Sequence, residues 1–208
     1  IEKIRSQLVT PIDDPIDASI ADSENEAAVL IAITDCDHSP SMVLTRRASH
    51  MNSHAGEVAF PGGKVEPTDD DLIVTALRES YEEIGLPIDV VDIVGALPSA
   101  TSKFGLQVTP FIGVIPNDVV LQANEDELDS IFHVPLQFFL DSKPSNDYEV
   151  SFRGVEYIVP CYRYEDYVIW GLTAYFIGDF LNRVYDLGLD LSMARSQMKK
   201  IIPDVQKE

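Results

Sequence analysis

The sequence predicts an α+β fold in which a mixed β-sheet lies between helices. Strand-like and helix-like segments follow one another without the strict βαβ alternation of a parallel sheet. Hydrophobic residues make up 45% of the 208 positions, enough to bury one substantial core. No repeat, low-complexity tract or linker divides the chain, so residues 1–208 are expected to form a single domain with an N-terminal extension over about 1–26.

The first half of the chain predicts a hairpin, a short strand and one long helix. Apolar runs at 27–34 and 42–45 flank a polar turn and predict the hairpin, and strand character returns at 57–60. Apolar positions over 69–84 recur at helical spacing, after a run of capping residues and before a helix-ending Gly85. Acidic side chains cover much of this helix, so it is the first candidate for a catalytic or metal-binding site.

The second half predicts further strands and two helices. The expected strands span 90–97, 107–115, 148–152 and 155–164, and the expected helices lie near 135–140 and over 172–187. On the last helix, four apolar side chains recur at helical spacing, which indicates either core packing or a homodimer contact. They are Phe176, Phe180, Val184 and Leu187.

Composition excludes several classes of partner. The formal net charge is −20, from 35 acidic and 15 basic residues, so binding to nucleic acid or to an anionic membrane is not expected, whereas cations are natural partners. No apolar run approaches the roughly 20 residues that cross a bilayer, and the first residues lack the order of a secretory signal. Cys36 and Cys161 are too few and too far apart for a disulfide framework or a zinc motif. A soluble, cytoplasmic protein is expected.

The strongest chemical signal lies on the acidic helix. Glu79, Glu82 and Glu83 are spaced i, i+3 and i+4, so their carboxylates converge on one helical face. Crowded like charges are stabilised by a cation, and hard oxygen ligands suit Mg²⁺ or Mn²⁺. Arg78 lies four residues before Glu82 and can orient it by a charge-assisted hydrogen bond. The alternative is a solvated acidic helix face without a ligand.

The segment before the helix favours the metal site. Phe60-Pro61-Gly62-Gly63 ends a strand, and paired glycines let the backbone approach a ligand or metal closely. Together with the helix, this segment resembles the signature of the Nudix hydrolase family. The residues that match it are Gly63, Asp70, Arg78, Glu79, Glu82, Glu83 and Gly85, within a Nudix box over about 63–86.

Two departures from the family signature stand out. The first spacer is one residue longer when Asp70 takes the place of the family's Glu, and Ser80 stands where an aliphatic residue is commoner. Neither departure touches the three Glu residues. The resemblance implies an α/β/α sandwich and a metal-dependent pyrophosphohydrolase that acts on a small nucleotide derivative.

A second motif, just upstream, resembles the coenzyme A pyrophosphatase branch of the family. Residues 43–48 (VLTRRA) are followed in register by Gly56 and by 60–63, while Asn52 stands where the branch has a second Arg. The resemblance implies hydrolysis of coenzyme A or its derivatives to 3′,5′-ADP and 4′-phosphopantetheine. Asn52 leaves open other nucleoside diphosphate derivatives, such as ADP-ribose or dinucleotides. A third alternative is a non-catalytic Nudix module that senses a nucleotide.

The resemblance also implies roles for individual residues. Glu79, Glu82 and Glu83 would bind the metal, with Arg78 beside them, and one of these carboxylates or Glu127 would act as general base toward water. The expected substrate-binding residues are Arg46, Arg47, Gly62, Gly63 and Lys103. Successive residues of a strand point to opposite faces, so at most one of the two adjacent arginines is expected in the pocket.

Other residues have two interpretations each. His54 is either a surface or capping group or a substrate contact, and Glu127 lies in an acidic run, 124–129, that is typical of a solvated loop. The aromatic side chains Tyr162, Tyr164 and Trp170 either line an adenine or pantetheine site or pack the sheet against the C-terminal helix.

Overall fold

The computed structural model describes residues 1–8, 18–21, 24–51, 54–102, 105–152, 155–189 and 191. Its strands are β1 (Glu26–Asp35), β2 (Ser41–Arg47), β3 (Val58–Ala59), β4 (Gly62–Lys64), β5 (Asp92–Ala96), β6 (Ala100–Thr101), β7 (Gln107–Pro116), β8 (Leu128–Pro135), β9 (Ser145–Phe152), β10 (Val155–Tyr164) and β11 (Tyr167–Trp170). Its helices are α1 (Glu2–Leu8), α2 (Leu72–Ile84), α3 (Leu136–Asp141) and α4 (Gly171–Tyr185), with a 3₁₀ turn η1 (Ile88–Val90).

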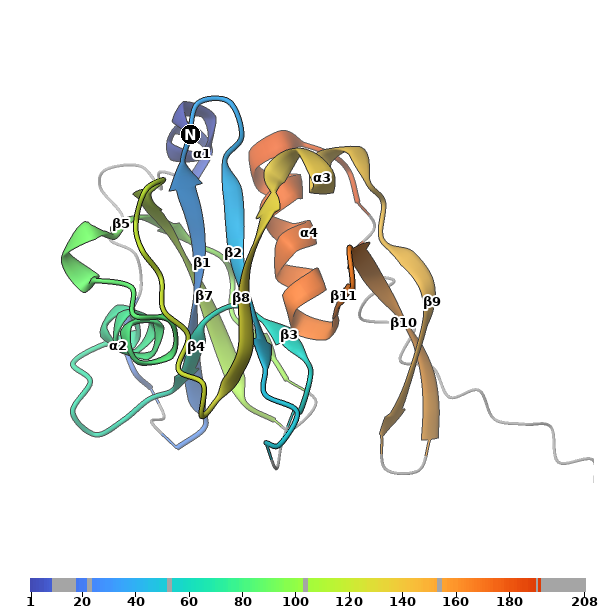
Figure 1. Cartoon of the computed structure of the whole chain (residues 1–208), viewed down its shortest axis with the longest axis horizontal. Coiled ribbons are helices and arrows are strands. Elements are labelled where there is room, and N and C mark those ends of the chain that lie inside the picture. The colour runs from blue at the N-terminus through green and yellow to red at the C-terminus, as the bar shows by residue number, and fades with distance from the viewer. Residues whose placement is uncertain are drawn as a thin grey trace, which may run out of the picture.

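These elements form two sheets with helices on both faces of the larger one. The eight-stranded sheet has the order β3-β2-β1-β7-β5, with β4, β6 and β8 attached at its margins, and the three-stranded sheet has the order β11-β10-β9. Helix α2 covers one face of the large sheet, and α4 lies on the other face beside the small sheet (Figure 1). The predicted α+β fold with a mixed sheet between helices is confirmed.

The centre of the large sheet is the parallel pair β1 and β7. The pair runs without a break from Glu26 opposite Gln107 to Asp35 opposite Pro116. Both strands are near-continuous apolar runs because both of their faces are covered. Along β1, Ala28, Leu30 and Ala32 pack in the core on the α2 side, and their neighbours pack in the core on the α4 side. The sheet therefore separates two apolar cores.

Most predicted elements are present, with shifts at their ends. The early hairpin is confirmed by the antiparallel pairing of β1 with β2. The acidic helix begins at Leu72 rather than at residue 69, because the Asp71 side chain caps it. Helix α1 and strands β4, β6, β8 and β11 were not predicted. Residues 128 and 129, at the end of the acidic run 124–129, belong to strand β8, which pairs with β2.

The apolar stripe of the last helix belongs to the core. Phe176, Phe180 and Val184 are buried within this chain, and Leu187 lies beyond the end of α4 and is exposed. The core-packing interpretation is thus confirmed for three of the four side chains. None of the helices in the described residues is long and apolar enough to span a membrane.

The aromatic residues of the small sheet also pack. The Tyr162 ring meets Phe139 edge-on, with centroids 5.2 Å apart, and Tyr164 meets Phe138 at 5.0 Å. Tyr162 is 2% exposed, and burial raises its pKa to about 12. Tyr162 and Tyr164 therefore pack against α3, while Tyr162 also borders the larger of two cavities described below and Trp170 borders both.

Candidate active site

Helix α2 is held firmly at both ends. At its start, the Asp71 carboxylate accepts a hydrogen bond from the Val74 amide at 2.8 Å. At its end, Gly85 adopts φ 64, and its amide donates to the Tyr81 carbonyl at 2.9 Å. Leu72, Ala76 and Ile84 are buried against the sheet. This packing fixes the rotation of the helix and directs the acidic side chains toward β4.

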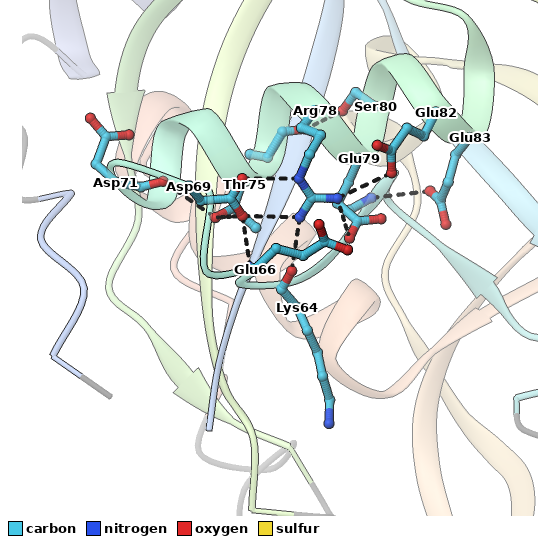
Figure 2. Close-up of polar contacts among 12 residues, drawn as sticks. Lys64, Glu66, Asp69, Asp71, Thr75, Arg78, Glu79, Ser80, Glu82 and Glu83 are labelled. Carbon is cyan, nitrogen blue, oxygen red and sulfur yellow. Dashed lines mark hydrogen bonds and ion pairs between the residues drawn. The ribbon is translucent and has the colours of Figure 1, made fainter. Parts of the chain in front are cut away.

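Arg78 is the centre of a hydrogen-bond network at this face of the helix. Its guanidinium donates to Asp69 through Nε and Nη2, each at 3.0 Å, and to the Lys64 carbonyl at 3.0 Å. Its Nη1 donates to Glu79 at 3.0 Å and to Glu82 at 3.1 Å (Figure 2). The guanidinium therefore fixes the loop before the helix and orients two of the predicted metal ligands.

Asp69, not Asp70, fills the acidic position that precedes the Arg-Glu run. The Asp69 side chain is 1% exposed and also accepts from the Thr75 hydroxyl and the Glu66 amide, at 2.9 Å each. The hydrogen bonds from Arg78 lower the pKa of Asp69 from 3.8 to about 2. Asp70 is exposed, so the assignment of Asp70 from sequence spacing was wrong by one residue. The two Asp residues are adjacent, and only the fold distinguishes them.

The paired glycines form β4 and run against β1. Gly62 pairs with Val29 and adopts φ 150, and a Cβ there would overlap the main chain of Ala28 and Val29. Gly63 has no such obstacle from the backbone, but a Cβ there would overlap the Glu79 carboxylate. The glycines thus have different roles: the first lets the strand approach β1, and the second leaves room for an acidic side chain.

Two alanine substitutions should separate these roles. Gly62→Ala is expected to destabilise the fold by roughly 1–3 kcal/mol, because the overlap is with backbone and the φ value suits glycine alone. Gly63→Ala is expected to leave the melting temperature nearly unchanged and to lower kcat/KM on the order of 10²-fold, because it displaces Glu79. Thermal unfolding and kinetics of both variants test this. An inactive but stable Gly62→Ala protein would contradict the assignment.

Glu83 is the most buried of the three predicted ligands. It is 4% exposed, accepts a hydrogen bond from the Gly62 amide at 3.1 Å, and lies 3.7 Å from Nη1 of Arg47. Burial raises the pKa of Glu83 to about 7, and the negative charges of Glu79 and Glu127 add to the rise. Burial also raises the pKa of Glu79. A carboxyl group poised near neutral pH is suited to proton transfer.

Glu127 lies at the same edge of the sheet. Its carbonyl accepts from the Ala48 amide at 2.8 Å, directly after β2, and the Asn124 amide donates to the Glu83 carbonyl at 2.8 Å. The 124–127 loop therefore covers the end of α2. The negative charge of Glu127 raises the pKa of both Glu79 and Glu83, so these three carboxylates share one electrostatic environment.

The donor set fits a hard divalent cation. Carboxylate oxygens from Glu79, Glu82 and Glu83, with Glu127 nearby, are the ligands that Mg²⁺ and Mn²⁺ prefer. In the residues that the structure describes, however, no three acidic, His or Cys side chains stand in a ready metal-binding arrangement. The Glu79 and Glu82 side chains instead turn toward Arg78, and Glu82 is 53% exposed and can rotate.

A cavity of about 1640 Å³ opens beside these carboxylates. Arg47, Gly63 and Lys64 line one part, and the remaining walls are mainly apolar residues of 58–60, β10, α4, 187–189 and 191. His54 and Glu57 also line it, with His54 Nδ1 2.6 Å from a Glu57 carboxylate oxygen. The substrate-contact interpretation of His54 therefore remains open. The cavity offers both cationic and apolar contacts to a long ligand.

The adjacent arginines point to opposite faces, as predicted from strand geometry. Arg47 faces Glu83 and lines the large cavity, whereas Arg46 lies 3.7 Å from Asp129 on the other face of β2 and does not line that cavity. Lys103 and Asn52 lie outside the described residues.

Comparison with known proteins shows the family of this chain. A family model described as the NUDIX domain matches residues 24–151. The chain is 43% identical over 152 residues to "Uncharacterized Nudix hydrolase NudL" of Enterobacter sp. (strain 638), covering 73% of this chain and 79% of the relative. It is 40% identical over 163 residues to the protein of that name from Yersinia enterocolitica, covering 78% and 83%. The chain belongs to the Nudix family.

Solved structures of Nudix proteins also match this chain, at low sequence identity. A MutT/nudix family protein from Enterococcus faecalis matches with a TM-score of 0.48 and 16% identity, covering 87% of this chain and 66% of that one. The Nudix hydrolase RenU from M. smegmatis matches with a TM-score of 0.47 and 19% identity, covering 56% and 74%.

Proposed function

We propose that this Nudix hydrolase cleaves a pyrophosphate linkage in a nucleoside diphosphate derivative, with Mg²⁺ or Mn²⁺ bound by Glu79, Glu82 and Glu83. One observation carries the proposal. The buried carboxylate of Glu83 and the partly buried carboxylate of Glu79 lie against the Gly62-Gly63 strand, beside Arg47. Such crowded acidic groups would be stabilised by a divalent cation, which would also bind oxygens of a substrate phosphate. The proposal treats the chain as one Nudix domain with an N-terminal extension.

The chain's own residues account for positioning and proton transfer. Arg78 holds Glu79 and Glu82 in place, and the Arg47 guanidinium offers paired donors to a phosphate oxygen. Glu83, the most buried of the three carboxylates, is the first candidate to take a proton from the attacking water, and Glu127 is the second. A bound ion would supply charge neutralisation at phosphate and lower the pKa of water.

The proposed substrate is coenzyme A or a derivative of it. The motif at 43–48 supports this choice, and so does a cavity whose apolar walls suit the long pantetheine arm. The second candidate is another nucleoside diphosphate derivative, such as ADP-ribose or a dinucleotide, and Asn52 favours it because it removes a cation from the motif. Ranking a substrate panel by kcat/KM separates the two.

Incubation with coenzyme A and Mg²⁺ is expected to yield 3′,5′-ADP and 4′-phosphopantetheine, detected by chromatography. Chelation should abolish the activity and added Mg²⁺ should restore it. Because the ion binds the folded state, Mg²⁺ at about 100 times its Kd should stabilise the protein by about 2.7 kcal/mol. A full panel without turnover, despite ligand-induced thermal stabilisation, would instead favour a non-catalytic nucleotide sensor.

A further inference from the structure

A second, smaller cavity adjoins the first and, like it, is lined by Val58 of β3. Its volume is about 340 Å³, within the range of roughly 300–1,000 Å³ typical of small-molecule sites. Three aromatic rings line it, together with one cation and several carboxylates. The residues that matter are Arg46, Asp129, Tyr148, Asp166, Tyr167 and Trp170.

The aromatic rings differ in how closely they already contact other side chains. The Tyr167 ring stacks on Phe132 with centroids 3.6 Å apart, and the Arg46 guanidinium lies 5.3 Å from the Tyr167 centroid. Trp170 and Tyr148 are instead tilted by 39° with centroids 5.5 Å apart, and both are half-buried at the cavity wall. This pair provides apolar ring surface against which a planar group can stack.

Arg46 supplies a buried donor atom that makes no hydrogen bond, although its guanidinium is ion-paired with Asp129 and lies over the Tyr167 ring. Its Nε is buried and makes no hydrogen bond, and the nearest Asp129 carboxylate oxygen is 3.7 Å away, beyond hydrogen-bond distance. A buried donor left unpaired costs free energy, which an acceptor on a ligand recovers. The wall of the cavity thus offers one donor beside a stacking surface.

The charge of the cavity selects the kind of ligand. Asp129, Asp166 and Glu57 outnumber Arg46, so the local field opposes a phosphate group. A neutral heteroaromatic ring suits these surroundings, because its ring nitrogens accept hydrogen bonds and its amino groups donate to carboxylates. A nucleobase has this chemistry.

The two cavities are neighbours. Glu57, Val58 and Trp170 line both of them, and the successive residues Arg46 and Arg47 each line one. We propose that the smaller cavity binds the base of the nucleotide substrate, stacked on Trp170 and Tyr148, while the diphosphate lies beside Arg47. This inference rests on the proposed function, since it assigns one end of the same substrate.

Trp170 is the single tryptophan of the chain, so its fluorescence reports directly on this site. The full chain in EDTA is titrated with AMP, and a saturable change in emission is expected. Ribose 5-phosphate, which lacks the base, should give none. Absence of a saturable change with AMP, or an equal change with ribose 5-phosphate, would overturn the proposal.

Because Trp170 borders both cavities, its fluorescence alone does not identify the cavity that binds AMP. Substitutions of residues that line only one cavity identify it. Tyr148→Ala is expected to weaken AMP binding roughly 5- to 100-fold, whereas Tyr148→Phe, which keeps the ring, should bind like wild type. Tyr81→Ala, which removes an exposed tyrosine of α2, is the matched control and should not change the Kd. A Tyr148→Ala Kd equal to that of wild type would contradict the assignment.

Hydrolysis assays on the same proteins distinguish the two proposals. The Tyr148→Ala substitution should raise KM with little change in kcat, since neither Glu83 nor Glu127 lines the cavity that Tyr148 lines. AMP binding at Trp170 without any hydrolysis would refute only the proposed function. Hydrolysis with an unchanged KM in Tyr148→Ala would refute only the base site.

Discussion

Replacement of Glu83 by Gln is expected to lower kcat roughly 10²- to 10⁴-fold while the fold persists. Glu83 is 4% exposed, lies between the Gly62 amide and Arg47, and has a pKa near 7. The amide of Gln can still accept the hydrogen bond from Gly62, but it neither binds a cation strongly nor takes a proton. Steady-state kinetics at saturating Mg²⁺ measures the loss, and thermal unfolding shows that the fold is retained.

Glu125→Gln is the matched control for this experiment. Glu125 is exposed in the loop that carries Glu127, and its substitution changes the net charge by the same amount. Activity close to wild type is expected for this variant. If Glu83→Gln were as active as wild type, the proton-transfer and metal-binding roles of Glu83 would both be refuted.

Arg78→Ala is expected to reduce the free energy of unfolding by about 3 kcal/mol, a large loss for a single side chain. The reason is that Asp69, whose side chain is 1% exposed, would keep a charge without its partner. A loss of this size lowers the melting temperature by roughly 6–12 °C in a domain of about 200 residues. Denaturant unfolding and calorimetry measure the two quantities.

Arg183→Ala provides the comparison. Arg183 pairs with Asp179 at 3.1 Å on the surface of α4 and its side chain is 47% exposed, so its loss should cost at most about 0.5 kcal/mol. A similar loss of stability in both variants would contradict the buried network.

Lowering the pH should weaken the same interaction between Asp69 and Arg78. The folded-state pKa of Asp69 is lowered from 3.8 to about 2, so its contribution is complete above pH 4 and is lost as the pH falls toward 2. The contribution is about 2 kcal/mol. The stability gap between wild type and Arg78→Ala should therefore narrow over that range.

Local patterns predicted the helix that carries the acidic residues and the strands at the centre of the sheet. Helix α2 has a capping Asp71, a terminal Gly85 and helical apolar spacing, all of which act within a few residues. Strand β8 was missed because Asp129, Ser130 and His133 dilute its alternation of buried positions. Pairing with β2 stabilises β8 as a strand, although the sequence pattern of β8 alone favours a strand only weakly.

The sequence predicted only those parts of the candidate site that lie within one short segment of the chain. The Glu spacing and the glycine pair are local, and so they could be recognised in the sequence. The selection of Asp69 over Asp70 depends on where Arg78 reaches, and the cavity at Trp170 depends on β11 meeting β3. Such contacts join distant parts of the chain, and no periodicity in the sequence records them.

The parallel pairing of β1 with β7 also bears on the order of assembly. Glu26 meets Gln107, so a long stretch of chain must emerge before the middle of the sheet can close. Such distant pairing makes folding slow, and Glu127, which shares the electrostatic environment of Glu79 and Glu83, follows β7 in the chain. During synthesis, the carboxylate cluster should therefore reach its working geometry late, and a half-made chain should not act on the nucleotide pool around it.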